Sequence, residues 1–140
     1  MEAVRTLVVP ASRPGMRRVA KDFDAFGTAR ALPPEVVRAV QVALDEMLSN
    51  IVRHGHGERG EGHQIEVSFR LDEGVLEVTI EDDAPPFDPL AASPPDTTGD
   101  LASRPEGGLG ILLTRKLMDE VEYERAGDRN RVVLRKRTGS

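Results

Sequence analysis

Residues 34–55 read PEVVRAVQVALDEMLSNIVRHG, and the rest of the chain is organised around this stretch. Apolar residues recur in it every three or four positions, at Val37, Val40, Leu44, Leu48 and Ile51. This spacing is typical of a helix that buries one stripe of its surface. Pro34 suits the first turn of such a helix, and Gly55 suits its end. The stretch therefore predicts one long core helix.

The polar side of this helix carries a candidate site. Glu46 and Asn50 lie four residues apart, so both side chains project from the same face. Arg53 and His54 continue the polar line toward the C-terminal end of the helix. A carboxylate one turn away from a carboxamide also occurs on ordinary solvated helix surfaces. The pair alone therefore leaves both interpretations open.

The composition limits the classes of protein to which the chain can belong. Its 140 residues suffice for one domain, and the lack of cysteine excludes disulfides, thiolate metal sites and cysteine nucleophiles. The N-terminus has no apolar run like that of a signal peptide, and no segment is apolar for long enough to span a bilayer. We therefore expect a cytoplasmic protein with no membrane partner. The formal charge is −5, with basic and acidic residues interspersed, which argues against nucleic acid as a partner.

The other predicted elements complete a mixed fold. Helical spacing of apolar residues predicts a helix over 14–26 and another that follows a glycine cluster, over 111–121. The predicted strands cover residues 5–9, 64–71, 75–80, 121–125 and 131–135. Strict alternation in 64–71 and 75–80 predicts an antiparallel hairpin, with a three-residue reversal at 72–74. The order β-α-α-β-β-loop-α-β-β predicts helices on one side of a mainly antiparallel sheet.

Two further features are ambiguous when each is taken alone. The cluster Gly107-Gly108-Leu109-Gly110 at the mouth of a helix suits anion binding, although it lacks the Lys-Ser/Thr of a P-loop and also suits a simple loop-to-helix hinge. Asp82 stands where a strand ends, so its carboxylate suits an exocyclic amine or, like Asp83 and Asp88, a turn. The three histidines do not favour a zinc site, because no carboxylate or cysteine completes a tetrahedral set.

The ordered set of motifs carries more information than its members. A Glu-x-x-x-Asn helix is followed by a hairpin ending in Asp-x-Ala-x-Pro-Phe, by a proline-rich loop, and by Gly-Gly-Leu-Gly opening a helix. This set resembles the GHKL (histidine kinase-like) ATPase superfamily. The segments NIVRHG, PFDP, GGLGILL and LMDEVEYER resemble its anti-sigma-factor serine/threonine kinase branch, the RsbW-like and SpoIIAB-like switch proteins of bacteria. The resemblance implies an α+β two-layer sandwich of the Bergerat type, with three helices covering one face of the sheet. It also implies one ATPase domain over residues 1–140 with a lid at about 83–106.

The resemblance implies catalytic and phosphate-binding roles for four side chains. Asn50 would hold Mg²⁺ against the phosphates of ATP or ADP. Glu46 would be the general base that takes a proton from the attacking hydroxyl, because it lies one turn from the metal ligand. Arg53 and Arg104 would neutralise phosphate charge.

The same resemblance implies how the base and the phosphate chain would be held. Asp82 would accept the N6 hydrogens of adenine, and Ala84 and Phe87 would line the base pocket. Phosphates would meet the backbone amides of Gly108 and Gly110, flanked by Gly107, Leu109 and Ile111. Ala84 departs from the family pattern, which has glycine there. A positive φ or close contact with the base at this position would strain alanine by about 1 kcal/mol or more. The last strand also lacks the threonine that larger relatives use near adenine.

The implied function is a kinase that phosphorylates a STAS-type anti-sigma-factor antagonist and sequesters a sigma factor, acting as a homodimer. The alternative is a nucleotide-dependent binding switch that does no chemistry, which Ala84 motivates. ATP hydrolysis that drives a large conformational cycle is less favoured, because the lid is short and no second domain is present.

Overall fold

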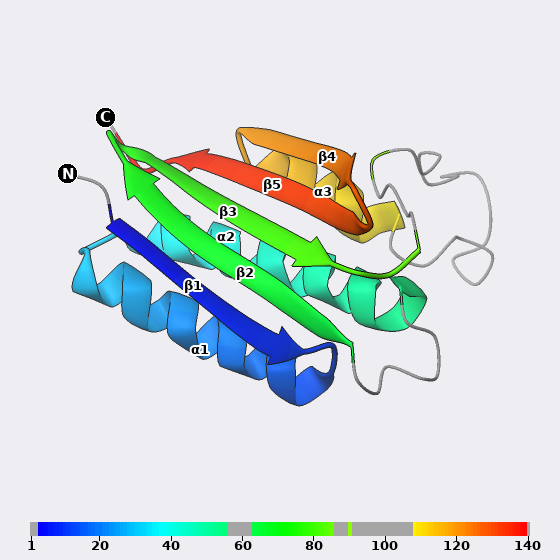
Figure 1. The fold of residues 1–140 in the computed structure, drawn as a ribbon. Helices are drawn as coiled ribbons and strands as arrows, with labels where there is room; N and C mark the ends of the chain where they lie inside the picture. Colours follow the sequence, from blue (N-terminus) through cyan, green and yellow to red (C-terminus); the bar gives the residue numbers. More distant parts are fainter. Residues whose placement is uncertain (1–2, 56–62, 86–89, 91–107, 140) are drawn as a thin grey trace.

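A computed structural model describes residues 3–55, 63–85, 90 and 108–139 of the chain. Its elements follow the predicted order (Figure 1). They are β1 (Ala3–Pro10), α1 (Arg13–Ala29), α2 (Pro34–Asn50), the π-helical segment η1 (Ile51–Gly55), β2 (Gln64–Asp72), β3 (Val75–Asp82), α3 (Gly108–Leu117), β4 (Glu120–Ala126) and β5 (Arg129–Arg137).

The five strands form one antiparallel sheet in the order β1-β2-β3-β5-β4. All three helices cover the same face of this sheet, and the other face is left open (Figure 1). The predicted α+β two-layer fold is therefore confirmed. The register sets Asp82, the last residue of β3, opposite Asn130 of β5.

The core lies between the two layers. Leu44 and Leu48 of α2 and Phe23 of α1 are almost fully buried, as the apolar spacing of both helices predicts. Alternate strand residues meet them, and the Phe23 ring packs edge-on against Phe69 of β2 at 5.0 Å between ring centroids. The helix α2 packs between α1 and α3. Because its apolar stripe faces the core, its polar side is available to form a site.

The long helix predicted over 34–55 changes its hydrogen bonding near its end. The α-helical part stops at Asn50, and residues 51–55 form a π-helical turn. The wider turn lets the adjacent residues Ile51 and Val52 both pack against the core. A pattern of apolar spacing does not reveal this change, because it assumes one constant period.

The reversal between β2 and β3 is tighter than predicted. Asp72 still pairs with Val75, so the turn contains two residues and not three. Both have positive φ, 51° at Glu73 and 77° at Gly74, as in a type I′ turn. Glycine tolerates this conformation, whereas glutamate is strained in it.

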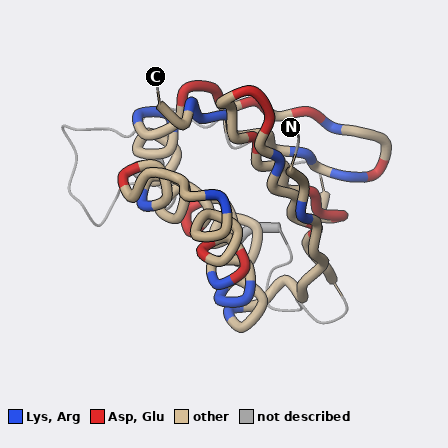
Figure 2. Tube along the Cα trace, turned by 90° about the vertical axis from the view of Figure 1, so that its left-hand side faces the viewer, with Lys and Arg blue, Asp and Glu red and all other residues tan. Residues whose placement is uncertain are grey.

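Charges of both signs are distributed over both layers. Residues of both signs lie on the helices and on the strands (Figure 2). Within the described ranges, every helix is too short or too polar to cross a membrane.

Candidate functional site

Asn50 ends α2 with a buried carboxamide. The residue is 4% exposed, and neither its Nδ2 nor its Oδ1 has a hydrogen-bond partner among the described residues. A buried polar group without a partner destabilises a protein by about 1–3 kcal/mol. Such groups are rare in folded proteins, and each one points to a missing ion, water or ligand.

Glu46 lies one turn before Asn50 and contacts the start of α3. A Cβ added to Gly110 would collide with Glu46 Oε2 and would lie 2.8 Å from Glu46 Cδ. The Glu46 carboxylate therefore lies against the first turn of α3, and a side chain at residue 110 would displace it. The buried hydroxyl of Thr114 donates to the Gly110 carbonyl at 2.8 Å and supports this turn from within the helix.

A polar hollow of about 350 Å³ opens beside Glu46, between α1 and α2. Its wall includes Arg13, Asp45 and Arg53. Glu46 thus borders both the start of α3 and a hollow with basic side chains on its rim. Arg53, which we predicted to neutralise phosphate charge, is exposed and lies on this side of the helix.

Asp82 is 3% exposed at the end of β3. Its Oδ1 accepts a hydrogen bond from the Ala84 backbone amide at 2.9 Å, which closes a tight turn. Ala84 is also buried, at 1% exposed. Among the described non-glycine residues, positive φ occurs at Ala31 and Glu73. Ala84 therefore has no positive φ and none of the strain that a positive φ would cause; the effect of close contact between Ala84 and the base stays a prediction.

Three residues of the β4–β5 hairpin complete the surroundings of Asp82, and our sequence reasoning missed them. Asn130 donates to Asp82 Oδ1 at 3.2 Å, Tyr123 donates to the Asn130 carboxamide oxygen at 2.6 Å, and Arg125 donates to the Ala84 carbonyl at 2.8 Å. One signal was present: Asn130 is polar at an inward position of a strand whose next inward residues are Val132 and Leu134.

The remaining predicted site residues divide into two groups. Gly108, Leu109 and Ile111 lie in the first turn of α3, and Ile111 is buried. Phe87, Arg104 and Gly107 fall outside the described residues, as does most of the predicted lid. The ends of α2 and β3 and the start of α3 all lie at the same end of the molecule (Figure 1). The nucleotide-binding roles of these residues stay predictions.

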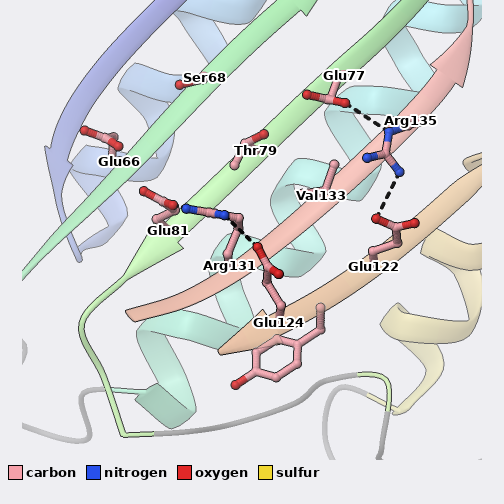
Figure 3. Close-up of a pocket in the computed structure, with 11 residues that line it drawn as sticks. Glu66, Ser68, Glu77, Thr79, Glu81, Glu122, Glu124, Arg131, Val133 and Arg135 are labelled. Carbon is pink, nitrogen blue, oxygen red and sulfur yellow. Dashed lines mark hydrogen bonds and ion pairs between the residues drawn. The ribbon is translucent and has the colours of Figure 1, made fainter. Parts of the chain in front are cut away.

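A second hollow, of about 610 Å³, lies on the open face of the sheet (Figure 3). Arg131 bridges Glu81 and Glu124 there, each at 2.6 Å, and Arg135 bridges three further glutamates, Glu77, Glu120 and Glu122. Hydrogen bonds to Glu81 and Glu124 raise the pKa of Arg131. Burial opposes ionisation of Glu81, but the bond from Arg131 helps to hold the pKa of Glu81 below its ordinary value. Since these charges are paired with one another, the hollow is a structural surface and not the candidate site.

A family model described as "Histidine kinase-like ATPase domain" matches residues 9–136. The chain belongs to this family. The predicted assignment to the histidine kinase-like ATPases is therefore confirmed.

Similar proteins lie in the branch that the motifs predicted. The chain is 33% identical to the "Serine-protein kinase RsbW" of Bacillus pumilus over 95 residues, which cover 64% of this chain and 59% of the relative. It is 33% identical to that of Bacillus subtilis over 94 residues, covering 63% and 57%. The matched region thus spans less than two thirds of these kinases.

One solved structure shares the fold. It is the crystal structure of the RsbU and RsbW domains of Rv1364c from Mycobacterium tuberculosis, with a TM-score of 0.70 at 14% identity. The alignment covers 96% of this histidine kinase-like ATPase domain and 32% of the other chain. At this identity the likeness concerns the fold.

The residues of this domain fit a magnesium-bound nucleotide. The amide of Asn50, which has no hydrogen-bond partner among the described residues, offers an oxygen of the type that Mg²⁺ binds. Gly108 and Gly110 leave two positions of the first turn of α3 without a side chain, which suits close approach of a phosphate to backbone amides.

Proposed function

We propose that this chain is an ATP-dependent serine/threonine protein kinase of the anti-sigma-factor type. It phosphorylates a STAS-type antagonist, sequesters a sigma factor, and works as a cytoplasmic homodimer. The observation that carries this proposal is the buried amide of Asn50, which has no hydrogen-bond partner in the described part of the chain and lies one turn from a carboxylate that contacts the first turn of α3. The similarity to RsbW serine-protein kinases supports the choice of reaction.

The chain's own residues divide the work of phosphoryl transfer. Asn50 would hold Mg²⁺, which would supply charge neutralisation on the phosphates, and the amides of α3 would bind the phosphate oxygens. Asp82 orients the adenine. Glu46 takes the proton of the acceptor hydroxyl, which reaches it through the hollow beside Arg13 and Arg53. Phe87 and Arg104 complete the predicted base pocket and lid.

The proposal is tested with labelled ATP, Mg²⁺ and a STAS-type antagonist protein. Replacing Glu46 by Gln keeps the shape of the side chain and removes its basicity, so transfer should fall by about 10²–10⁴-fold while ATP binding persists. Glu35→Gln, in the exposed first turn of the same helix, is the matched control and should transfer label at the wild-type rate. Equal transfer by wild type and Glu46→Gln would reject the assignment of the base.

The alternative is a switch without chemistry. Ala84 adopts its turn without positive φ, so the remaining motivation for the alternative is close contact of Ala84 with the base. The transfer assay separates the kinase from a nucleotide-dependent switch, because only the kinase transfers label. Calorimetry with Mg²⁺-ATP and Mg²⁺-ADP tests whether nucleotide binds, and binding that Asp82→Asn weakens would support the predicted role of Asp82. No heat of binding at millimolar nucleotide would exclude the kinase and leave a nucleotide-independent switch.

A further inference from the structure

The carboxamide of Asn130 has one orientation that its neighbours permit. One end faces three oxygen acceptors, Asp82 Oδ1 at 3.2 Å, the Ala84 carbonyl at 3.2 Å and the Pro85 carbonyl at 3.1 Å. The other end faces the Tyr123 hydroxyl at 2.6 Å and the Arg125 guanidinium at 3.3 Å. Since a guanidinium donates and never accepts, Oδ1 of Asn130 must face Arg125, and Nδ2 must face Asp82.

In this orientation, the two carboxylate oxygens of Asp82 differ in their hydrogen bonds. Oδ1 accepts from Asn130 and from the Ala84 amide. Oδ2 forms no hydrogen bond with the part of the chain that the structure describes. The Ala84 carbonyl is also engaged, because Asn130 and Arg125 both donate to it. The acceptor left open on Asp82 is therefore Oδ2.

The hairpin that supplies these donors is rigidly attached to β3. Asp82 and Asn130 are direct cross-strand partners, and Arg125 of β4 is the partner of Asn130. Asp82 and Asn130 are each at most 4% exposed. The position of the open oxygen is consequently set by three neighbouring strands, and not by the loop that follows Asp82.

We propose that Asn130 is a positioning residue for base specificity. By holding Oδ1 of Asp82, it aims Oδ2 at the exocyclic position of the base and selects bases that carry an amine there. Adenine presents a donor at C6, whereas guanine presents an acceptor. Tyr123 assists by holding the Asn130 carboxamide in its required orientation. This inference rests on the proposed function, in which Asp82 receives adenine.

The test compares two ligands that differ only in the 6-amino group. Binding of Mg²⁺-ATP and of Mg²⁺-purine riboside triphosphate, which lacks this group, is measured by calorimetry. The proteins are wild type, Asn130→Ala, Tyr123→Phe and the control Val133→Thr. Val133 lies on the same strand as Asn130 but faces the open side of the sheet. Thermal unfolding of each variant monitors the fold.

Wild type should prefer ATP over the analogue by about tenfold or more, the size expected for a hydrogen bond to a charged group. Asn130→Ala should reduce this preference at least about fivefold by weakening ATP and leaving the analogue unchanged. Tyr123→Phe should reduce it less, and Val133→Thr should keep it.

Equal weakening of both ligands by Asn130→Ala would show mere structural support and overturn the inference. An unchanged preference would overturn it as well. If Asn130→Ala does not fold, Tyr123→Phe decides, because it removes a single hydroxyl, and an unchanged preference there rejects the proposal. Wild type that binds neither ligand would refute the proposed function itself, which separates that failure from a failure of Asn130.

Discussion

Asn50 shows how a residue of a proposed site can reduce the stability of the ligand-free protein. Its amide is buried without a hydrogen-bond partner among the described residues, whereas another carboxamide of α2, that of Gln41, donates to the Ala20 carbonyl at 2.8 Å. Both side chains end in a carboxamide, but among the described residues only the carboxamide of Gln41 has a hydrogen-bond partner. Their substitutions should therefore change stability in opposite directions.

Replacing Asn50 by Leu, a side chain of similar shape, should raise the free energy of unfolding of the ligand-free protein by about 1 kcal/mol. The same change should abolish binding of Mg²⁺-ATP. Gln41→Leu is the control and should lower the free energy of unfolding by about 1 kcal/mol. Urea denaturation and calorimetry measure both effects. A loss of stability in Asn50→Leu would mean that the amide is already satisfied in solution.

Gly110 determines how closely α3 approaches Glu46. Gly110→Ala should cost little stability, since the gain in helix propensity of about 1 kcal/mol offsets the movement of a side chain. Transfer of phosphate to the acceptor should nevertheless fall, because the new Cβ displaces the Glu46 carboxylate. In a Glu46→Ala background the same substitution should change transfer no further. Additive losses in the double variant would show that Gly110 acts independently of Glu46.

At the scale of elements, the β2–β3 hairpin carries local strain. Glu73 has a φ of 51° and Gly74 a φ of 77°, and Asn-Gly is the preferred pair for such a turn. Glu73→Asn should raise the melting temperature, with a gain of about 0.5–1 kcal/mol. Gly74→Ala should lower the melting temperature, because the backbone conformation of residue 74 disfavours a Cβ. This holds although nothing lies within 4 Å of the new Cβ. Thermal unfolding of the two variants tests the prediction, and a shift in the same direction would contradict it.

Most elements were predictable from local pattern, and their exact form was not. Alternation predicted β2 and β3, because each has one face in the core and one outside. The two-residue turn and the π-helical segment η1 were mispredicted. Both depend on backbone hydrogen bonding, which in η1 follows from the packing of Ile51 and Val52 against the core. Residue spacing does not encode such a change of period.

At the scale of the whole molecule, two clusters of ion pairs on the open face, around Arg131 and Arg135 of β5, link β3, β5 and β4. Glu81 has the lower exposure in its pair with Arg131, at 13% against 38%. Since its pKa in the folded protein lies below the ordinary 4.5, ionised Glu81 stabilises the fold above pH 4.5. This contribution is lost as the pH falls through the lowered pKa.

Glu81→Gln should therefore lower the free energy of unfolding at pH 7 by about 1 kcal/mol, a modest value because Arg131 is partly exposed to solvent. Below the lowered pKa, wild type and variant should be equally stable, since both then carry a neutral side chain. Glu124→Gln, which changes the 60% exposed partner of the same arginine, should have little effect at either pH. Urea denaturation at a series of pH values from 7 downward measures these differences, and a gap that does not narrow as the pH falls would contradict the assignment.

Local sequence was sufficient for the element order, the family and the residues of the α2 and α3 motifs. These features depend on periodicity and on short spacings between residues that are close in the sequence. Glu46 and Asn50, for example, share a helix face because they are four positions apart. The support of Asp82 was not predictable in this way. Asn130 lies 48 positions away and reaches Asp82 only through the register of β3 with β5, and Tyr123 and Arg125 arrive with the next strand. Such contacts are decided when the sheet assembles, because long-range pairing is a property of the packed chain and not of any one segment.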